Sequence, residues 1–90
     1  MIQIGSRPTS REPIGPRALE VAIANAVKKF APACETFVGV IVEQSVPGSP
    51  EDANWKVKGI KFGRAEREAC SVALSVVVER LGREFELARS

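Results

Sequence analysis

The sequence contains no histidine and no tyrosine, and its aromatic residues are four phenylalanines and one tryptophan. Without histidine, the chain cannot form a Ser–His or Cys–His catalytic dyad or use an imidazole as a metal ligand. The two cysteines, Cys34 and Cys70, do not have the spacing of a metal site. We therefore expect no metal, no cofactor and no enzymatic activity.

Long apolar runs are also missing. Residues 1–15 lack the apolar stretch of a signal peptide, and no segment has the roughly 20 apolar residues that a membrane span requires. We expect a bacterial cytoplasmic protein with free thiols and no membrane partner.

The first fifteen residues differ in composition from the rest of the chain. They combine glycine and proline with Ser, Thr and Arg, which is typical of a linker. We expect residues 1–15 to form a flexible N-terminal arm and residues 16–90 to form a single domain. Ile2 and Ile4 alternate with other residues, which also fits a short edge strand.

Two segments have the 3.6-residue apolar period of an amphipathic helix. The first is Arg17–Ala31, with a proline on each side. The second runs from Arg64 to about Ala88 and contains Gly82, which costs a helix about 1 kcal/mol relative to alanine. If the helix ends at this glycine, Arg83–Ala88 forms a short extra helix.

Between the helices, two segments show the two-residue alternation of β-strands. Thr36–Val46 is apolar on both faces, which predicts that both faces are covered. Asn54–Phe62 changes phase at Gly59, which predicts a β-bulge. In the intervening loop, Ser49–Asp52 resembles a capped helical turn. The chain therefore predicts a small α+β domain of the αββα type, in which two helices pack with an antiparallel hairpin, and leaves open a short extra N-terminal strand.

The order helix, strand, strand, helix is similar to that of the double-stranded RNA-binding domain. The segment Ala65–Cys70 opens the second helix much as that family's second helix opens. The family has three strands where this chain has two, and its loop histidine is missing here. Its paired lysines at the helix start are absent here, where Arg64 and Arg67 are the only basic residues and have Glu66 and Glu68 beside them. No residue role is transferred from the family.

The two predicted strands and their flanks carry charges of opposite sign. Residues 35–52 contain four acidic residues and no basic residue, whereas residues 56–67 contain five basic residues and one acidic residue. The basic residues suit contact with a phosphate backbone, and the start of the second helix offers free N–H groups to an anion. The alternative is a solvated face or a protected strand edge. The candidate nucleic-acid or anion contacts are Lys56, Lys58, Lys61, Arg64 and Arg67.

Other reactive side chains are few. Cys34 follows the first helix, where an exposed thiol would be reactive, whereas Cys70 lies on the apolar stripe of the second helix and is expected to be inert. Glu43, Glu51 and Asp52 could bind a metal or act as acid and base, but their spacing matches no known loop. We expect them to be solvated loop charges.

A two-stranded sheet alone is only marginally stable, so it needs further strands or packing. Three features of the sequence predict that self-association supplies them. The first strand is apolar on both faces, the second helix has a wide apolar arc, and the hairpin has one acidic and one basic limb. We expect a homodimer that shares a sheet or packs through the second helix. The candidate interface residues are Phe37, Ile41, Trp55, Val72 and Val76.

The favoured function is a small non-enzymatic interaction domain that binds itself or another protein. The first alternative is a nucleic-acid-binding module that uses the basic strand and the start of the second helix. The second is a small-ligand-binding protein or an enzyme of unknown reaction.

Overall fold

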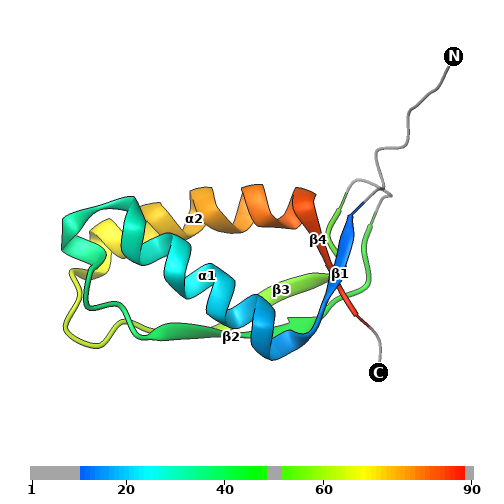
Figure 1. Ribbon diagram of the computed structural model, residues 1–90, viewed down its shortest axis with the longest axis horizontal. Helices are drawn as coiled ribbons and strands as arrows, with labels where there is room; N and C mark the ends of the chain where they lie inside the picture. The colour runs from blue at the N-terminus through cyan, green and yellow to red at the C-terminus, as the bar shows by residue number, and fades with distance from the viewer. Residues whose placement is uncertain (1–10, 49–51, 89–90) are drawn as a thin grey trace, which may run out of the picture.

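The structure, a computed structural model, describes residues 11–48 and 52–88 of the chain. It confirms the predicted α+β architecture, with an antiparallel hairpin packed against two helices (Figure 1). The helices and the hairpin strands are α1 at Pro16–Phe30, β2 at Gly39–Gln44, β3 at Trp55–Lys61 and α2 at Arg67–Glu84. No helix among the described residues is long and apolar enough to cross a membrane.

A second small sheet closes one end of the molecule. It consists of β1, Glu12–Ile14, and β4, Phe85–Leu87, which pair in parallel (Figure 1). The segment expected to be a flexible arm therefore contains a strand, and the strand considered at Ile2–Ile4 lies outside the described residues. A helix reaching about Ala88, or a short helix at Arg83–Ala88, is wrong because the backbone becomes extended at Phe85, with φ −129° and ψ 149°.

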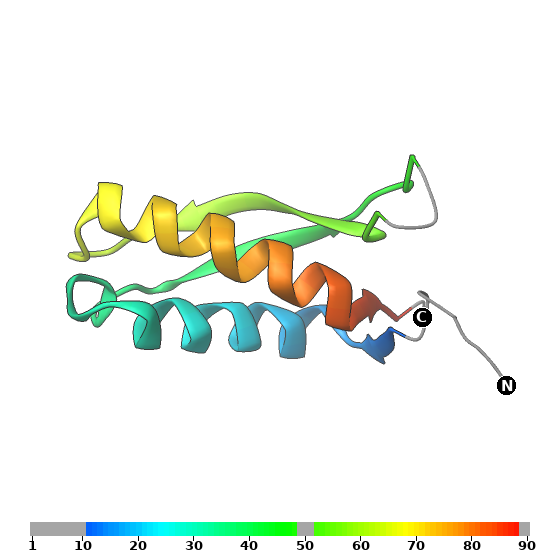
Figure 2. The same cartoon turned by 90° about the horizontal axis from the view of Figure 1, so that it is seen from above.

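Both helices lie on one side of the hairpin. The helix α1 runs alongside β2, and α2 lies antiparallel to α1 and above the hairpin (Figures 1 and 2). Burying a large aliphatic side chain contributes about 1.5–3 kcal/mol, so the apolar core between these elements holds them together. Its largest members are Leu19, Ile23, Val27, Phe37, Val40, Val42, Trp55, Leu74, Val77, Leu81 and Leu87.

Local sequence signals mark the two ends of α1, whereas part of α2 is helical because of its tertiary packing. Pro16 occupies the first turn of α1, where its missing N–H costs nothing, and two lysines in the last turn suit the negative end of the helix. The chain then forms a 3₁₀ turn at Pro32–Cys34. The run Val76–Val78 is a poor helix former. It remains helical in α2 because Val77 is buried in the core.

The hairpin confirms the predicted bulge but shortens the first strand. Ile41 pairs with Gly59 and Val42 pairs with Val57, so Lys58 is the extra residue. The strand β2 begins at Gly39, not at Thr36. The preceding Phe37 still belongs to a turn, in which its N–H donates to the Cys34 carbonyl at 3.0 Å. A strand that began at Thr36 would place Val38 on the same face as the buried Val40. Val38 is instead exposed and Phe37 is buried, so the predicted alternation fails there.

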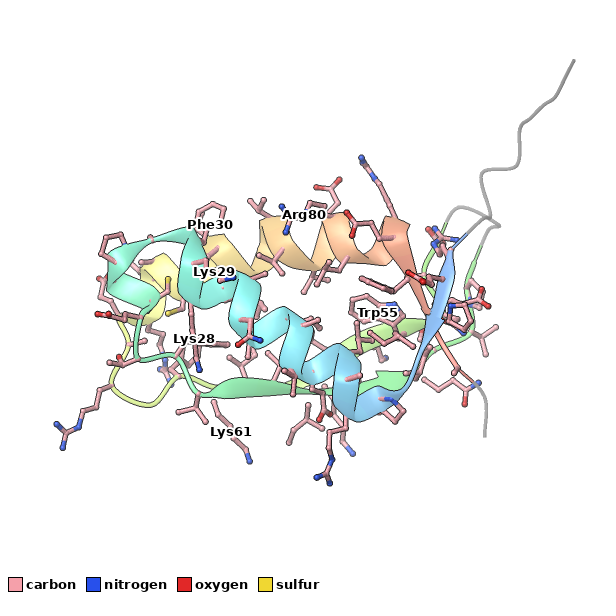
Figure 3. The ribbon with its side chains drawn as sticks, viewed as in Figure 1. Lys28, Lys29, Phe30, Trp55, Lys61 and Arg80 are labelled. Atoms are coloured by element: carbon pink, nitrogen blue, oxygen red, sulfur yellow. The ribbon has the colours of Figure 1, made fainter. Side chains whose placement is uncertain are left out.

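The hairpin and the small sheet are joined by the side chain of Asn54. Its Nδ2 donates to the Leu87 carbonyl at 3.1 Å, and its Oδ1 accepts from the Leu87 N–H at 2.7 Å. The amide thus satisfies β4 on the edge that β1 does not use. The neighbouring Trp55 donates from Nε1 to the Phe85 carbonyl at 3.2 Å, and Figure 3 shows its ring above β3, beside the small sheet.

We expect Asn54→Ala to lower the free energy of unfolding by about 2 kcal/mol, because it leaves a partly buried N–H and a partly buried C=O of Leu87 unpaired. Urea denaturation followed by tryptophan fluorescence measures this change. The control is Asn25→Ala, which alters an exposed asparagine on α1 and should not destabilise the protein. Equal stability of the two variants would contradict the role assigned to Asn54.

Two glycine-to-alanine substitutions should shift stability in opposite directions. Gly63 has φ +62°, and a Cβ there would lie 2.6 Å from Val38 Cγ2, so Gly63→Ala should cost at least about 1–2 kcal/mol. Gly82 lies within α2, and a Cβ there would meet Ala53 Cβ at an ordinary 3.5 Å. Gly82→Ala should therefore add about 0.5–1 kcal/mol. Thermal unfolding measures both changes, and a loss of stability in Gly82→Ala would show that its site does not tolerate a methyl group.

Candidate interaction surface

The two edges of the hairpin differ in whether another part of the chain hydrogen-bonds to them. On the β2 side, Glu20 of α1 reaches the strand, and its Oε2 accepts a hydrogen bond from the Val42 N–H at 3.0 Å. A carboxylate in this position prevents another strand from pairing there. On the other side, β3 has β2 as its single strand neighbour in the described chain. The outer edge of β3 is therefore open.

A shallow apolar groove runs along this open edge, between β3 and α2. Val57 and Ile60 of β3 and Leu74 and Val78 of α2 supply apolar side chains, and Ser75 and Glu79 supply a polar rim. The hollow has a volume of about 400 Å³. Ile60 remains 41% exposed although it lies opposite the buried Val40. Sequence analysis missed this groove, and the signal for it was the phase change at Gly59, which turns Ile60 toward α2.

The five candidate basic residues do not converge on one site. Lys56 forms an ion pair with Glu43 across the hairpin at 3.5 Å; the Lys56 side chain is largely exposed, and that of Glu43 is partly buried. Lys61 projects from the face of the hairpin that the helices leave open (Figure 3). Arg67 instead lies over the Phe62 ring, with 5.1 Å from its Cζ to the ring centroid. Lys58 lies in the bulge, and Arg64 is exposed ahead of α2.

The N-terminal end of α2 does not favour binding of an anion. Glu66 occupies the position before the first helical residue, and Glu68 lies in the first turn. Carboxylates at this end already interact favourably with the helix dipole, and they repel a phosphate.

The candidate interface residues fall into two groups. Phe37 and Trp55 are almost completely buried, and Phe37 packs edge-to-face against Phe62 with ring centroids 6.1 Å apart. An interface role does not fit their burial, because both form part of the core of this chain. Ile41 is 40% exposed on the open face of the hairpin, and Val72 and Val76 are exposed on α2. These three remain available to a partner.

Cys34 and Cys70 are both buried free cysteines. The expectation that Cys34 could be exposed is wrong, because its 3₁₀ turn packs the thiol into the core. Burial raises the pKa of the Cys70 thiol to about 11, and a hydrogen bond with the Cys34 side chain acts in the same direction. Cys70 is therefore an inert thiol at neutral pH, as the sequence suggested.

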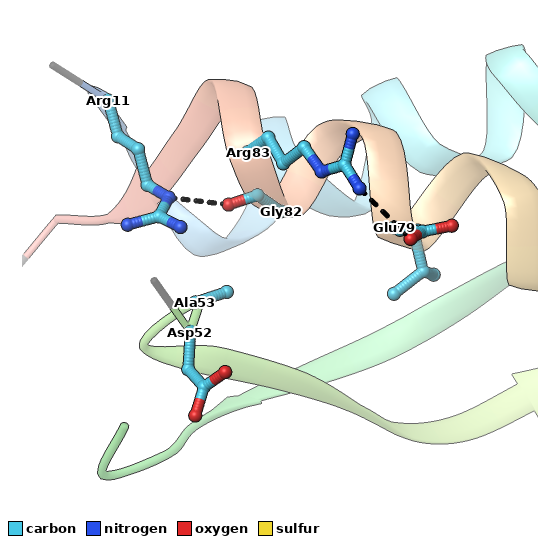
Figure 4. A pocket seen from close by; sticks show the side chains of 7 residues that line it. Arg11, Asp52, Ala53, Glu79, Gly82 and Arg83 are labelled. Carbon is cyan, nitrogen blue, oxygen red and sulfur yellow. Dashed lines mark hydrogen bonds and ion pairs between the residues drawn. The ribbon is translucent and has the colours of Figure 1, made fainter. Parts of the chain in front are cut away.

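A wider hollow lies at the C-terminal end of α2 (Figure 4). Arg11 donates from Nε to the Gly82 carbonyl at 2.6 Å, and Arg83 pairs with Glu79 at 3.1 Å. The hollow measures about 590 Å³, and Asp52 and Ala53 form its opposite side. Its charged groups serve contacts within the chain, so we assign it no ligand.

The acidic residues that the structure describes are not grouped as metal ligands. In the described ranges, no group of three or more Cys, Asp or Glu side chains could hold a metal ion. Glu43 is engaged with Lys56, and Asp52 Oδ2 accepts from the Gly48 N–H at 3.2 Å. Glu51 lies outside the described residues, as does most of the expected turn at Ser49–Asp52.

Comparisons of this chain with protein-family models, with curated proteins and with solved structures find no match. Its function must be inferred from the surfaces described above.

The raised pKa of Cys70 predicts a loss of stability at high pH. Above the ordinary value of 9.0 the unfolded chain releases the thiol proton, whereas the folded chain retains it up to about pH 11. The free energy of unfolding should therefore fall across this window, and no tyrosine titrates there. Urea titrations on both sides of the window measure the change. Cys70→Ala should show a smaller decline, and an equal decline would refute the assignment.

Proposed function

We propose that this chain is a small non-enzymatic interaction domain that forms a cytoplasmic homodimer through α2. The observation that supports this proposal is a row of four exposed residues spaced four apart, here called the outer row: Glu68, Val72, Val76 and Arg80. Val72 and Val76 leave 62% and 47% of their surface exposed. Residues four apart form a continuous ridge on a helix, and such ridges pack into the grooves of a second helix.

The outer row is complementary to itself. When two copies of α2 pack antiparallel about a two-fold axis, Val72 of one copy meets Val76 of the other. The same axis brings Glu68 opposite Arg80, twice per dimer. Opposite charges at the two ends of an apolar centre fit the requirement of a two-fold interface, in which one patch must match its own copy.

The two charges of this row are available for a partner. The spacing of Arg80 and Glu84 would allow an ion pair, but none forms between them in the described part of the chain, whereas Glu79 and Arg83 do pair. Figure 3 shows Phe30, at the end of α1, on the same side of the molecule as Arg80. Phe30 is 48% exposed, so it would extend the apolar contact with an aromatic side chain, a type enriched at interfaces.

Nucleic-acid binding is a second candidate, and the exposure of Lys58, Lys61 and Arg64 favours it. Lys56 is partly neutralised by Glu43, and Arg67 is held against Phe62. We therefore rank this function below self-association. It predicts binding that weakens steeply as salt rises.

We expect the purified full-length chain to have the mass of a dimer by light scattering on a sizing column. Val76→Asp should give a monomer, because it would bury two unpaired carboxylates. The matched control is Val21→Asp, which changes a 53% exposed valine on α1 outside the outer row and should leave the dimer intact. A monomeric wild-type chain would refute the proposal.

A charge exchange tests the orientation of the two helices within the same experiment. Glu68→Arg should weaken the dimer by at least about tenfold, since it places two arginines opposite each other at both ends. Adding Arg80→Glu restores opposite charges and should restore the dimer. If the double variant remained monomeric while folding normally, the antiparallel arrangement would be wrong.

A further inference from the structure

We propose that the open edge of β3 binds an extended peptide in which acidic and apolar residues alternate, so that the peptide adds a third strand to the hairpin. This surface differs from the outer row of α2, and the proposal does not rest on the dimer. Three properties of β3 support it: an unpaired edge, an adjoining apolar groove and a charge of one sign.

The unpaired edge follows from the register of the hairpin. Hydrogen-bonded and non-bonded pairs alternate in an antiparallel ladder. The Ser45 N–H donates to the Asn54 carbonyl at 2.8 Å, and the Val38 N–H donates to the Lys61 carbonyl at 3.2 Å. The carbonyl groups of Asn54 and Lys61 therefore point toward β2. With the bulge at Lys58, the main-chain groups of Trp55, Val57 and Ile60 therefore face outward.

The other edges among the described strands are shorter or are partly occupied by side chains. Glu20 accepts the Val42 N–H on the edge of β2, and Asn54 and Trp55 occupy the side of β4 that β1 leaves unused. The remaining strand, β1, has three residues, whereas β3 has seven. The β3 edge is therefore the longest one in the described chain that can accept a partner strand.

The groove gives this edge a second point of recognition. A strand paired with β3 would direct alternate side chains toward α2, above the apolar surface of Val57, Ile60 and Val78. Main-chain hydrogen bonds then supply affinity, and the groove selects apolar side chains at every second position.

The peptide side chains that point away from the groove lie on the open face of the hairpin, where they are selected by charge. Lys56 and Lys61 lie on this face, Lys58 is in the bulge, and β3 contains no acidic residue. Within the hairpin, Lys56 already has a carboxylate opposite it, that of Glu43. An added strand with acidic residues on this face would give the lysines the same partner on their other side.

The lysines also argue against other occupants. Two β3 edges that paired with each other would bring lysines of both copies together, which disfavours a second copy of this chain. A nucleic-acid backbone would meet the lysines, but it has neither main-chain N–H groups to pair with the edge nor apolar side chains for the groove.

The test uses the full-length chain and a capped peptide of alternating Glu and Val, as long as the seven residues of β3. Binding is measured by isothermal titration calorimetry, and slowed amide exchange at Trp55, Val57 and Ile60 locates it. Two control peptides have the same composition, one with its glutamates and valines in separate blocks and one N-methylated at alternate amides. Both should bind at least about tenfold more weakly, because each removes the pairing pattern.

Two matched pairs of variants test the groove and the charge. Ile60→Ala should weaken binding about fivefold to tenfold, whereas Ile41→Ala, which removes an equally exposed isoleucine outside the groove, should not. Lys58→Glu should weaken binding by at least about tenfold, whereas Lys28→Glu on α1 should have little effect.

Three results would overturn the proposal. Equal binding of the alternating and block peptides would show attraction by charge alone. Binding of a single-stranded oligonucleotide, without binding of any peptide, would assign the edge to nucleic acid. A dimer dissociated by Ile60→Ala but not by Val76→Asp would place a second copy at this edge. The last result would also refute the proposed α2 interface, whereas the first two leave that interface unaffected.

Discussion

The two hydrogen bonds between the Asn54 side chain and the Leu87 main chain are the constraint that joins the two sheets of this fold. Neither small sheet is a stable unit in isolation, because two-stranded sheets are marginal in water. Asn54 immediately precedes β3, so its amide presents a substitute strand edge to β4 while its main chain continues into the hairpin. Trp55 reinforces the contact from the next position, through its ring in the core and its N–H on the Phe85 carbonyl. Since β1 pairs with β4, the same contact holds the start of the described chain.

The contacts that satisfy the strand edges and fill the core determine which surfaces are left for partners. The strand β4 is satisfied on both sides, β2 is covered by Glu20, and the inner face of α2 is used by the core. A domain of this size buries only about 60% of the surface of its unfolded chain, so some apolar residues must remain outside. Some of them lie on the outer row of α2, at the β3 groove and on the open face of the hairpin, and others lie on α1 and on either side of β2. The outer row and the β3 groove are the places where exposed apolar side chains coincide with a pattern of charge or with an open strand edge.

The periodic segments could be predicted from the sequence because their burial follows a regular spacing. The two helices, the hairpin and the bulge at Gly59 all produce such a spacing, as does the exposure of Val72 and Val76 on the far flank of α2. The pairing of β1 with β4 could not be predicted in this way. Phe85–Leu87 follows α2 directly, with no loop between them, and its partner strand lies about seventy residues earlier in the chain. The Asn54 contact is invisible for the same reason, since an amide clamp depends on a distant main chain and produces no local pattern. The burial of Phe37 was missed because a turn, and not a strand, positions it.

The two proposed surfaces differ in a way that assigns them different partners. The outer row carries an acid at one end and a base at the other, so we propose its own copy, in antiparallel orientation, as its partner. The β3 edge carries lysines without acids, a charge that opposes pairing with its own copy, so we propose an acidic strand as its partner. A dimer formed through α2 would display two such edges on one particle. A partner with two acidic strands could then occupy both edges, and its second contact would form at a high effective concentration. Self-association would in this way strengthen binding at a surface that takes no part in the dimer contact.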